Sequence, residues 1–159
     1  MPHKILAVDD EKHIVRLVQI NLQKEGYDVV TASTGREALV QVEREKPDLV
    51  IMDVMMPDMG GFEALQTMRA DEKTAQIPVI MLTAKAQDAD VFQGWKSGAD
   101  LYLTKPFNPQ ELLTFVKRIL HDKDKEADSA YHLDESNIYR IDELKAVDLN
   151  GDENSIELT

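Results

Sequence analysis

The six residues Asp48-Leu49-Val50-Ile51-Met52-Asp53 form a short apolar segment in the first half of this 159-residue chain. Four consecutive apolar residues stand between two aspartates, and Pro47 ends the amphipathic segment before them. A strand that helices cover on both faces has such a continuously apolar pattern, whereas a strand with one solvated face alternates apolar and polar residues. The stretch therefore predicts a buried parallel strand that ends at Asp53.

Similar apolar runs occur on both sides of this strand, and amphipathic segments separate them. Gly26 ends the first amphipathic segment, while Asn108 and Pro109 have the cap and first-turn chemistry that opens the last one. Strands alternating with helices indicate an α/β fold, in which a parallel sheet has helices on both faces. The predicted strands cover residues 4–8, 27–31, 48–53, 77–83 and 101–103, and one of the predicted helices covers residues 86–96.

Polar residues follow four of the predicted strands. Asp9 and Asp10 follow the first, Asp53 ends the third, Thr83 ends the fourth and Lys105 follows the fifth. Each of these residues alone is ordinary, because aspartates cap helices and lysines are common in loops. In a doubly wound sheet, however, ligands bind beyond the carboxyl ends of the strands, so all five side chains are expected at one edge.

This set of side chains suits phosphoryl chemistry. Clustered carboxylates repel one another, and Mg²⁺, which prefers oxygen ligands, relieves that repulsion. A carboxylate such as Asp53 can then act as a nucleophile toward phosphorus. The ammonium of Lys105 and the hydroxyl of Thr83 can contact the transferred oxygens.

These residues resemble the receiver domain of bacterial two-component response regulators. The resemblance covers roughly residues 3–121 and implies a five-stranded, flavodoxin-like sheet in the order 2-1-3-4-5. The matching stretches are residues 5–11, 48–57, 79–84 and 98–107.

The resemblance also implies a role for each matching position. Asp53 would accept the phosphoryl group, and Asp9, Asp10, Asp53 and the backbone carbonyl of Met55 would hold Mg²⁺. Thr83 and Lys105 would contact the phosphoryl oxygens.

Two further positions match structural features of the family. Tyr102 occupies the aromatic switch position, which would respond together with Thr83. The peptide bond between Lys105 and Pro106 would be cis, a geometry that is essentially confined to X-Pro bonds.

The implied function is that of a switch rather than an enzyme acting on external substrates. A sensor histidine kinase or a phosphotransfer protein would phosphorylate Asp53. Phosphorylation would remodel the surface formed by the fourth helix, the fifth strand and the fifth helix, for an output protein or for a homodimer.

Two alternatives are a Mg²⁺-dependent phosphohydrolase that forms an aspartyl phosphate and a receiver-like binding module that is never phosphorylated. Such hydrolases usually carry an acid two residues after the nucleophile, where Met55 stands here. The complete set of site residues argues against the binding module. Neither Met55 nor Lys85 supplies an acid that could position water, so a long-lived phosphorylated state is expected.

Charge divides the chain into a predicted receiver domain over residues 1–121 and an acidic linker and tail over residues 122–159. The net charge is -12, and the tail, with twelve Asp or Glu against four Lys or Arg, carries -8 of it. This acidity predicts no direct contact with nucleic acid. The tail contains no recognisable output domain. No apolar run reaches the roughly 20 residues of a membrane span, and cysteine is absent, which together predict a cytoplasmic location.

Overall fold

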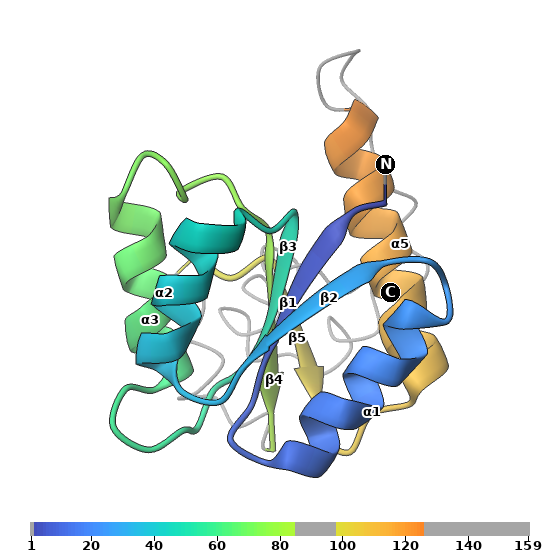
Figure 1. Ribbon diagram of the computed structural model, residues 1–159, viewed down its shortest axis with the longest axis horizontal. Helices are drawn as coiled ribbons and strands as arrows, with labels where there is room; N and C mark the ends of the chain where they lie inside the picture. The colour runs from blue at the N-terminus through green and yellow to red at the C-terminus, as the bar shows by residue number, and fades with distance from the viewer. Residues whose placement is uncertain (1, 85–97, 126–159) are drawn as a thin grey trace, which may run out of the picture.

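The computed structural model describes residues 2–84 and 98–125 (Figure 1). The predicted helix over 86–96 and the tail from residue 126 onward lie outside the described residues. Five parallel strands form one sheet in the order β2-β1-β3-β4-β5, which confirms the predicted fold. The elements are β1 (Lys4–Val8), α1 (Lys12–Gln23), β2 (Asp28–Ala32), α2 (Gly35–Glu45), β3 (Leu49–Asp53), α3 (Gly61–Ala70), β4 (Val79–Thr83), β5 (Leu101–Thr104) and α5 (Pro109–Lys125).

Helices cover both faces of the sheet, and β3 shows why its sequence is continuously apolar. Helices α1 and α5 lie on one face, while α2 and α3 lie on the other (Figure 1). Leu49 and Ile51 belong to the core under α1 and α5, whereas Val50 and Met52 belong to the core under α2 and α3. All four side chains are at most 1% exposed. Both faces of β3 are therefore hydrophobic core.

The strands end almost level at their carboxyl edge. Val8 pairs with Met52, Asp53 pairs with Leu82, and Thr83 pairs with Thr104. This register sets the residues that follow β1 and β5 beside the ends of β3 and β4.

Two element boundaries differ from the sequence prediction by two residues or more, while the bounds of β2, β3 and β5 differ by one. Strand β4 begins at Val79 rather than at residue 77, because Ile77 belongs to a turn in which its amide donates to the carbonyl of Thr74. Helix α5 continues to Lys125, so residues 122–125 are helical rather than linker. Two long-range contacts hold this end of the helix: an ion pair between Lys123 and Asp48, and a hydrogen-bond contact between the His3 ring and the Asp124 carboxylate.

Arg69, near the end of α3, connects three segments of the chain through a set of contacts called here the Arg69 clasp. Its guanidinium donates to the backbone carbonyls of Ala75, Ile77 and Gly98 and to the carboxylate of Asp100, over 2.7–3.1 Å. The clasp fixes both the turn before β4 and the turn before β5.

In the part of the chain that the structure describes, no helix combines the length and the apolar character needed to cross a bilayer.

Candidate functional site

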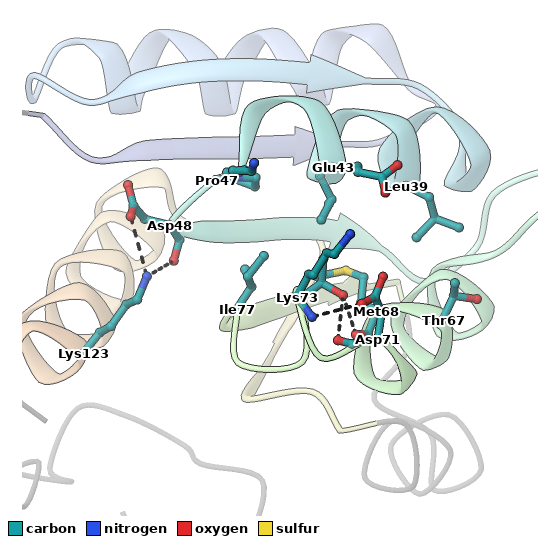
Figure 2. Close-up of a pocket in the computed structure, with 13 residues that line it drawn as sticks. Leu39, Glu43, Pro47, Asp48, Thr67, Met68, Asp71, Lys73, Ile77 and Lys123 are labelled. Carbon is teal, nitrogen blue, oxygen red and sulfur yellow. Dashed lines mark hydrogen bonds and ion pairs between the residues drawn. The ribbon is translucent and has the colours of Figure 1, made fainter. Parts of the chain in front are cut away.

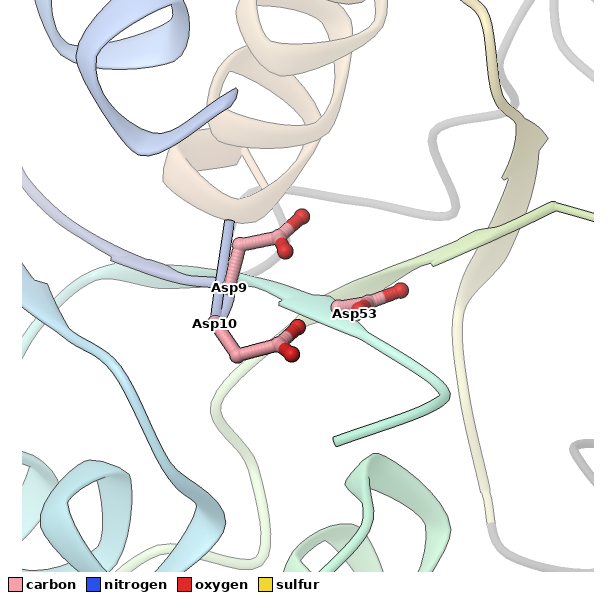
Figure 3. A group of neighbouring side chains, drawn as sticks. All are labelled: Asp9, Asp10 and Asp53. Carbon is pink, nitrogen blue, oxygen red and sulfur yellow. The ribbon is translucent and has the colours of Figure 1, made fainter. Parts of the chain in front are cut away.

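Three carboxylates meet at the carboxyl edge of the sheet (Figure 3). Asp9 and Asp10 follow β1, and Asp53 is the last residue of β3. One oxygen from each lies within 4.8 Å of the others. Asp9 and Asp53 are only 2% and 4% exposed, whereas Asp10 faces solvent. Such a donor set of hard oxygens, open on one side, fits a divalent cation that keeps several waters.

Backbone hydrogen bonds fix the main chain at Asp9 and just after Asp53, and so position two of the three carboxylate-bearing residues. The amide of Asp9 donates to the carbonyl of Ala32 at 3.2 Å, which extends the pairing of β1 with β2 by one residue. The Asp9 carboxylate accepts the amide of Glu11 at 3.0 Å. Beyond Asp53, the amide of Val54 donates to the carbonyl of Leu82 at 2.8 Å.

Lys105 brings a positive charge into this cluster. Its Nζ lies 3.0 Å from Asp9 Oδ2, 3.0 Å from Glu11 Oε1 and 3.4 Å from Asp53 Oδ1. The side chain is only 13% exposed. The Lys105 amide donates to the carbonyl of Thr83 at 2.7 Å, and the bond from Lys105 to Pro106 is cis.

The electrostatics follow from burial and crowding. Burial raises the pKa of Asp53 to about 6, and the charge of Asp9 adds to this shift while Lys105 opposes it. Burial also raises the pKa of Asp9. Burial alone would lower the pKa of Lys105, but hydrogen bonds to Asp9 and Glu11 and the charge of Asp53 raise it overall. The surroundings of Asp53 therefore disfavour its ionised form, and a cation bound at the cluster would favour that form.

The other predicted site residues lie at or near this edge. Thr83 is buried at the end of β4. Tyr102 is 7% exposed, and its ring packs edge-on against Phe62 with centroids 6.3 Å apart. Met55 lies two residues beyond Asp53, and 72% of its surface is exposed.

Sequence reasoning gave no role to Glu11, although the structure places it in direct contact with Lys105. The available signal was a third acid directly after Asp9 and Asp10, at the residue before helix α1.

A separate pocket of about 510 Å³ lies between α2 and α3 (Figure 2). Its lining includes Pro47 and Asp48, which precede β3, and Lys123 of α5. It opens at the amino end of β3, the end opposite Asp53, and so does not contribute to the acidic cluster.

This doubly wound sheet, with an acidic cluster at the carboxyl edge, defines the class of CheY-like receiver folds. Residues 5–117 match the family described as response regulator receiver domain, and the chain belongs to that family. Receiver domains bind Mg²⁺ at an acidic pocket of this kind.

Individual relatives agree with this assignment. The chain is 48% identical over 130 residues to the alkaline phosphatase synthesis transcriptional regulatory protein PhoP of Bacillus subtilis, an alignment covering 82% of this chain and 53% of PhoP. It is 45% identical over 129 residues to the DNA-binding dual master transcriptional regulator RpaA of Synechocystis, covering 81% and 54%. The chain thus spans about half the length of these curated relatives.

Solved receiver domains match over nearly their whole length. A CheY-like receiver domain from Methanospirillum hungatei has a TM-score of 0.75 and 34% identity, covering 79% of this chain and 99% of that one. The chemotaxis regulator CheY4 of Vibrio cholerae has a TM-score of 0.71 and 39% identity, covering 75% and 99%.

These relatives contradict one expectation from the sequence. The net charge predicted no direct contact with nucleic acid, yet RpaA is described as DNA-binding, and PhoP is described as a transcriptional regulator. That prediction is wrong because the charge of these 159 residues does not indicate what the regulators of this family bind. Net charge reports only on the residues counted, and the relatives have a further half that the alignments do not cover.

Proposed function

We propose that Asp53 accepts a phosphoryl group from a phosphohistidine of a sensor kinase or a phosphotransfer protein. The observation that carries this proposal is the meeting of Asp9, Asp10 and Asp53 within 4.8 Å, with Lys105 beside them. Asp9, Asp10, Asp53 and the carbonyl of Met55 would hold Mg²⁺, which would neutralise charge on the transferring phosphoryl oxygens.

The protein groups then have distinct tasks. An oxygen of Asp53 attacks phosphorus, the new P–O bond forms as the P–N bond to the histidine breaks, and the bonding pair returns to the imidazole. The Lys105 ammonium pairs with a phosphoryl oxygen, and the hydroxyl of Thr83 donates to another. Asp53 must be ionised to attack, and with its pKa near 6 a large fraction is ionised at neutral pH.

We further propose that phosphorylation acts on a surface that includes β5 and α5. Thr83 ends β4 and Tyr102 lies in the adjacent strand, so movement at the phosphoryl group reaches β5 directly. By analogy with PhoP and RpaA, the switched output is DNA-binding transcriptional control in the cytoplasm. The helix expected over 86–96, the remaining part of this surface, lies outside the described residues.

Turnover of external phosphate esters is disfavoured. A phosphohydrolase of the aspartyl-phosphate type needs an acid or base two residues after the nucleophile, and the thioether of Met55 can neither donate nor accept a proton there. The relatives' descriptions as transcriptional regulators agree with a switch.

The test is incubation with Mg²⁺ and a small phosphodonor, followed by intact-mass measurement. The wild-type chain should gain one phosphoryl group, and Asp53→Asn should gain none. Asp58→Asn is the matched control, because Asp58 is a nearby exposed aspartate paired with Arg36 at 2.7 Å. Equal labelling of the wild type and Asp53→Asn would refute the proposal.

A further inference from the structure

We propose that Glu11 is a positioning residue for Lys105. Its carboxylate keeps the Lys105 ammonium in place when the carboxylates of Asp9 and Asp53 bind a cation instead of the lysine. This inference rests on the proposed function, because it concerns the same lysine and the same carboxylates. Glu11 follows the proposed cation ligands Asp9 and Asp10 in the sequence but is not itself a proposed ligand.

The position of Glu11 in helix α1 is the first observation. Glu11 is the N-cap residue of α1, where Ser, Thr, Asp or Asn usually accepts a backbone hydrogen bond from the first turn. Within the described structure, the Glu11 carboxylate makes no such capping bond. It reaches Lys105, 94 residues along the chain, at 3.0 Å. Glu11 therefore departs from the usual N-cap preference and gains no capping hydrogen bond in return. Such a residue is expected to interact with a part of the fold outside its own helix.

The sharing of Lys105 is the second observation. The ammonium lies 3.0 Å from Asp9 Oδ2, 3.0 Å from Glu11 Oε1 and 3.4 Å from Asp53 Oδ1. Asp9 and Asp53 also belong to the acidic cluster, so Lys105 competes with a cation for those two carboxylates. Glu11 is outside the cluster and does not enter that competition.

Together these contacts give Glu11 a defined task. When Asp9 and Asp53 lose Lys105 as a partner, the ammonium keeps one carboxylate at 3.0 Å, beside the site where the phosphoryl group arrives. Without Glu11, Lys105 would depend on Asp9 and Asp53 alone and would hold them more tightly against a cation.

The experiment is a double-mutant cycle read out by Mg²⁺ binding, using calorimetric titration of the full chain without phosphodonor. The four proteins are the wild type, Glu11→Gln, Lys105→Met and the double variant. Glu11→Gln should weaken Mg²⁺ binding about two- to fivefold, the range expected for a partly exposed ion pair. In the Lys105→Met background the same change should have almost no effect, because the ammonium that Glu11 holds is gone.

Glu25→Gln is the matched control, since Glu25 forms a comparable pair with Lys117 at 3.1 Å beyond the other end of α1. It should leave Mg²⁺ binding unchanged. No effect of Glu11→Gln, or an equal loss with and without Lys105, would overturn the proposal, because the second result is what simple loss of a nearby negative charge predicts. Failure of the wild type itself to bind Mg²⁺ would overturn the proposed function together with this inference.

Discussion

Asp53 holds its proton to a higher pH than an ordinary aspartate. Burial raises its pKa from 3.8 to about 6, and the negative charge of Asp9 contributes to the shift. Between these two values the folded chain binds more protons than the unfolded chain. Stability is therefore lost as the pH rises through this window, since ionised Asp53 is tolerated less well in the fold than in water.

Replacing this carboxylate should therefore stabilise the cation-free protein. At neutral pH, Asp53→Asn should raise the free energy of unfolding by up to about 3 kcal/mol, the equivalent of the pKa shift. At about pH 4.5, where folded Asp53 is already protonated, the gain should fall to about a third of this. Urea titrations with a chelator at both pH values measure the difference. A gain independent of pH would show that the carboxylate charge is not its cause.

The side chain of Met55 bears on how long the phosphoryl group persists. Met55 is 72% exposed two residues beyond Asp53, and its thioether cannot act as an acid or base toward water. We therefore expect a long-lived phosphorylated state. Its decay can be monitored by intact-mass measurement after the phosphodonor is removed. Met55→Asp should shorten the lifetime, because a carboxylate there can orient an attacking water. A wild-type half-life of seconds would contradict this expectation.

At the scale of elements, the start of α3 is tightly packed against the end of β3. A Cβ on Gly61 would collide with the backbone carbonyl of Asp53 and would lie 2.7 Å from the terminal methyl of Met81. Gly61→Ala should cost about 1–3 kcal/mol of stability in thermal or urea unfolding. It should also slow phosphorylation, since relief of the collision displaces the backbone of Asp53.

Gly60→Ala is the matched control for this substitution. A Cβ on Gly60 would lie 3.2 Å from the carbonyl of Val54, a contact that a small shift relieves. Its effect on both stability and phosphorylation should be smaller. Equal effects of the two substitutions would show that packing against Asp53 is not special.

The Arg69 clasp gives a second prediction at this scale. Arg69→Ala leaves the carbonyls of Ala75, Ile77 and Gly98 without their guanidinium donors and should lower stability by about 2–4 kcal/mol. Arg69→Lys should rescue only part of the loss, because an ammonium cannot reproduce the planar fork. Arg44→Ala, on the exposed surface of α2, should change stability by less than about 0.5 kcal/mol. Urea unfolding of the three variants distinguishes these outcomes.

Local sequence predicted most of the elements, and its two larger errors share one cause, which is a contact with a distant part of the chain. The range predicted for β1 was that of the structure, and β3 differed by one residue, because an apolar run bounded by charges is a local signal. Ile77 looked like strand, but Arg69 binds its carbonyl from α3. Residues 122–125 looked like linker, but partners at His3 and Asp48 hold them as helix.

The candidate site divides in the same way. The rule that ligand sites lie beyond the carboxyl ends of parallel strands was enough to predict one shared edge for five side chains: Asp9, Asp10, Asp53, Thr83 and Lys105. Their functional roles remain predictions. The contact between Glu11 and Lys105 depends on the direction of two long side chains 94 residues apart, which no local pattern specifies.

For the whole molecule, the prediction concerns association. If phosphorylation remodels a surface that includes β5 and α5, then Mg²⁺ with beryllofluoride should shift the chain from monomer toward dimer. Light scattering coupled to size-exclusion chromatography measures this shift. Asp53→Asn should remain in its original state under the same conditions. A dimer that forms equally in both proteins would be independent of the switch.

The strand order also determines how long β1 lacks one of its partner strands while the chain is being synthesised. Strand β1 pairs with β2 on one edge and with β3 on the other, so its second edge cannot be covered before residues 49–53 have been made. At usual synthesis rates of 5–20 residues per second, residues 9–48 take about 2–8 s. Strand β1 therefore leaves the ribosome about this long before β3, and until β3 follows, the nascent chain carries an apolar strand with an open edge. This early species, rather than the finished domain, is where chaperones should bind and where aggregation should begin.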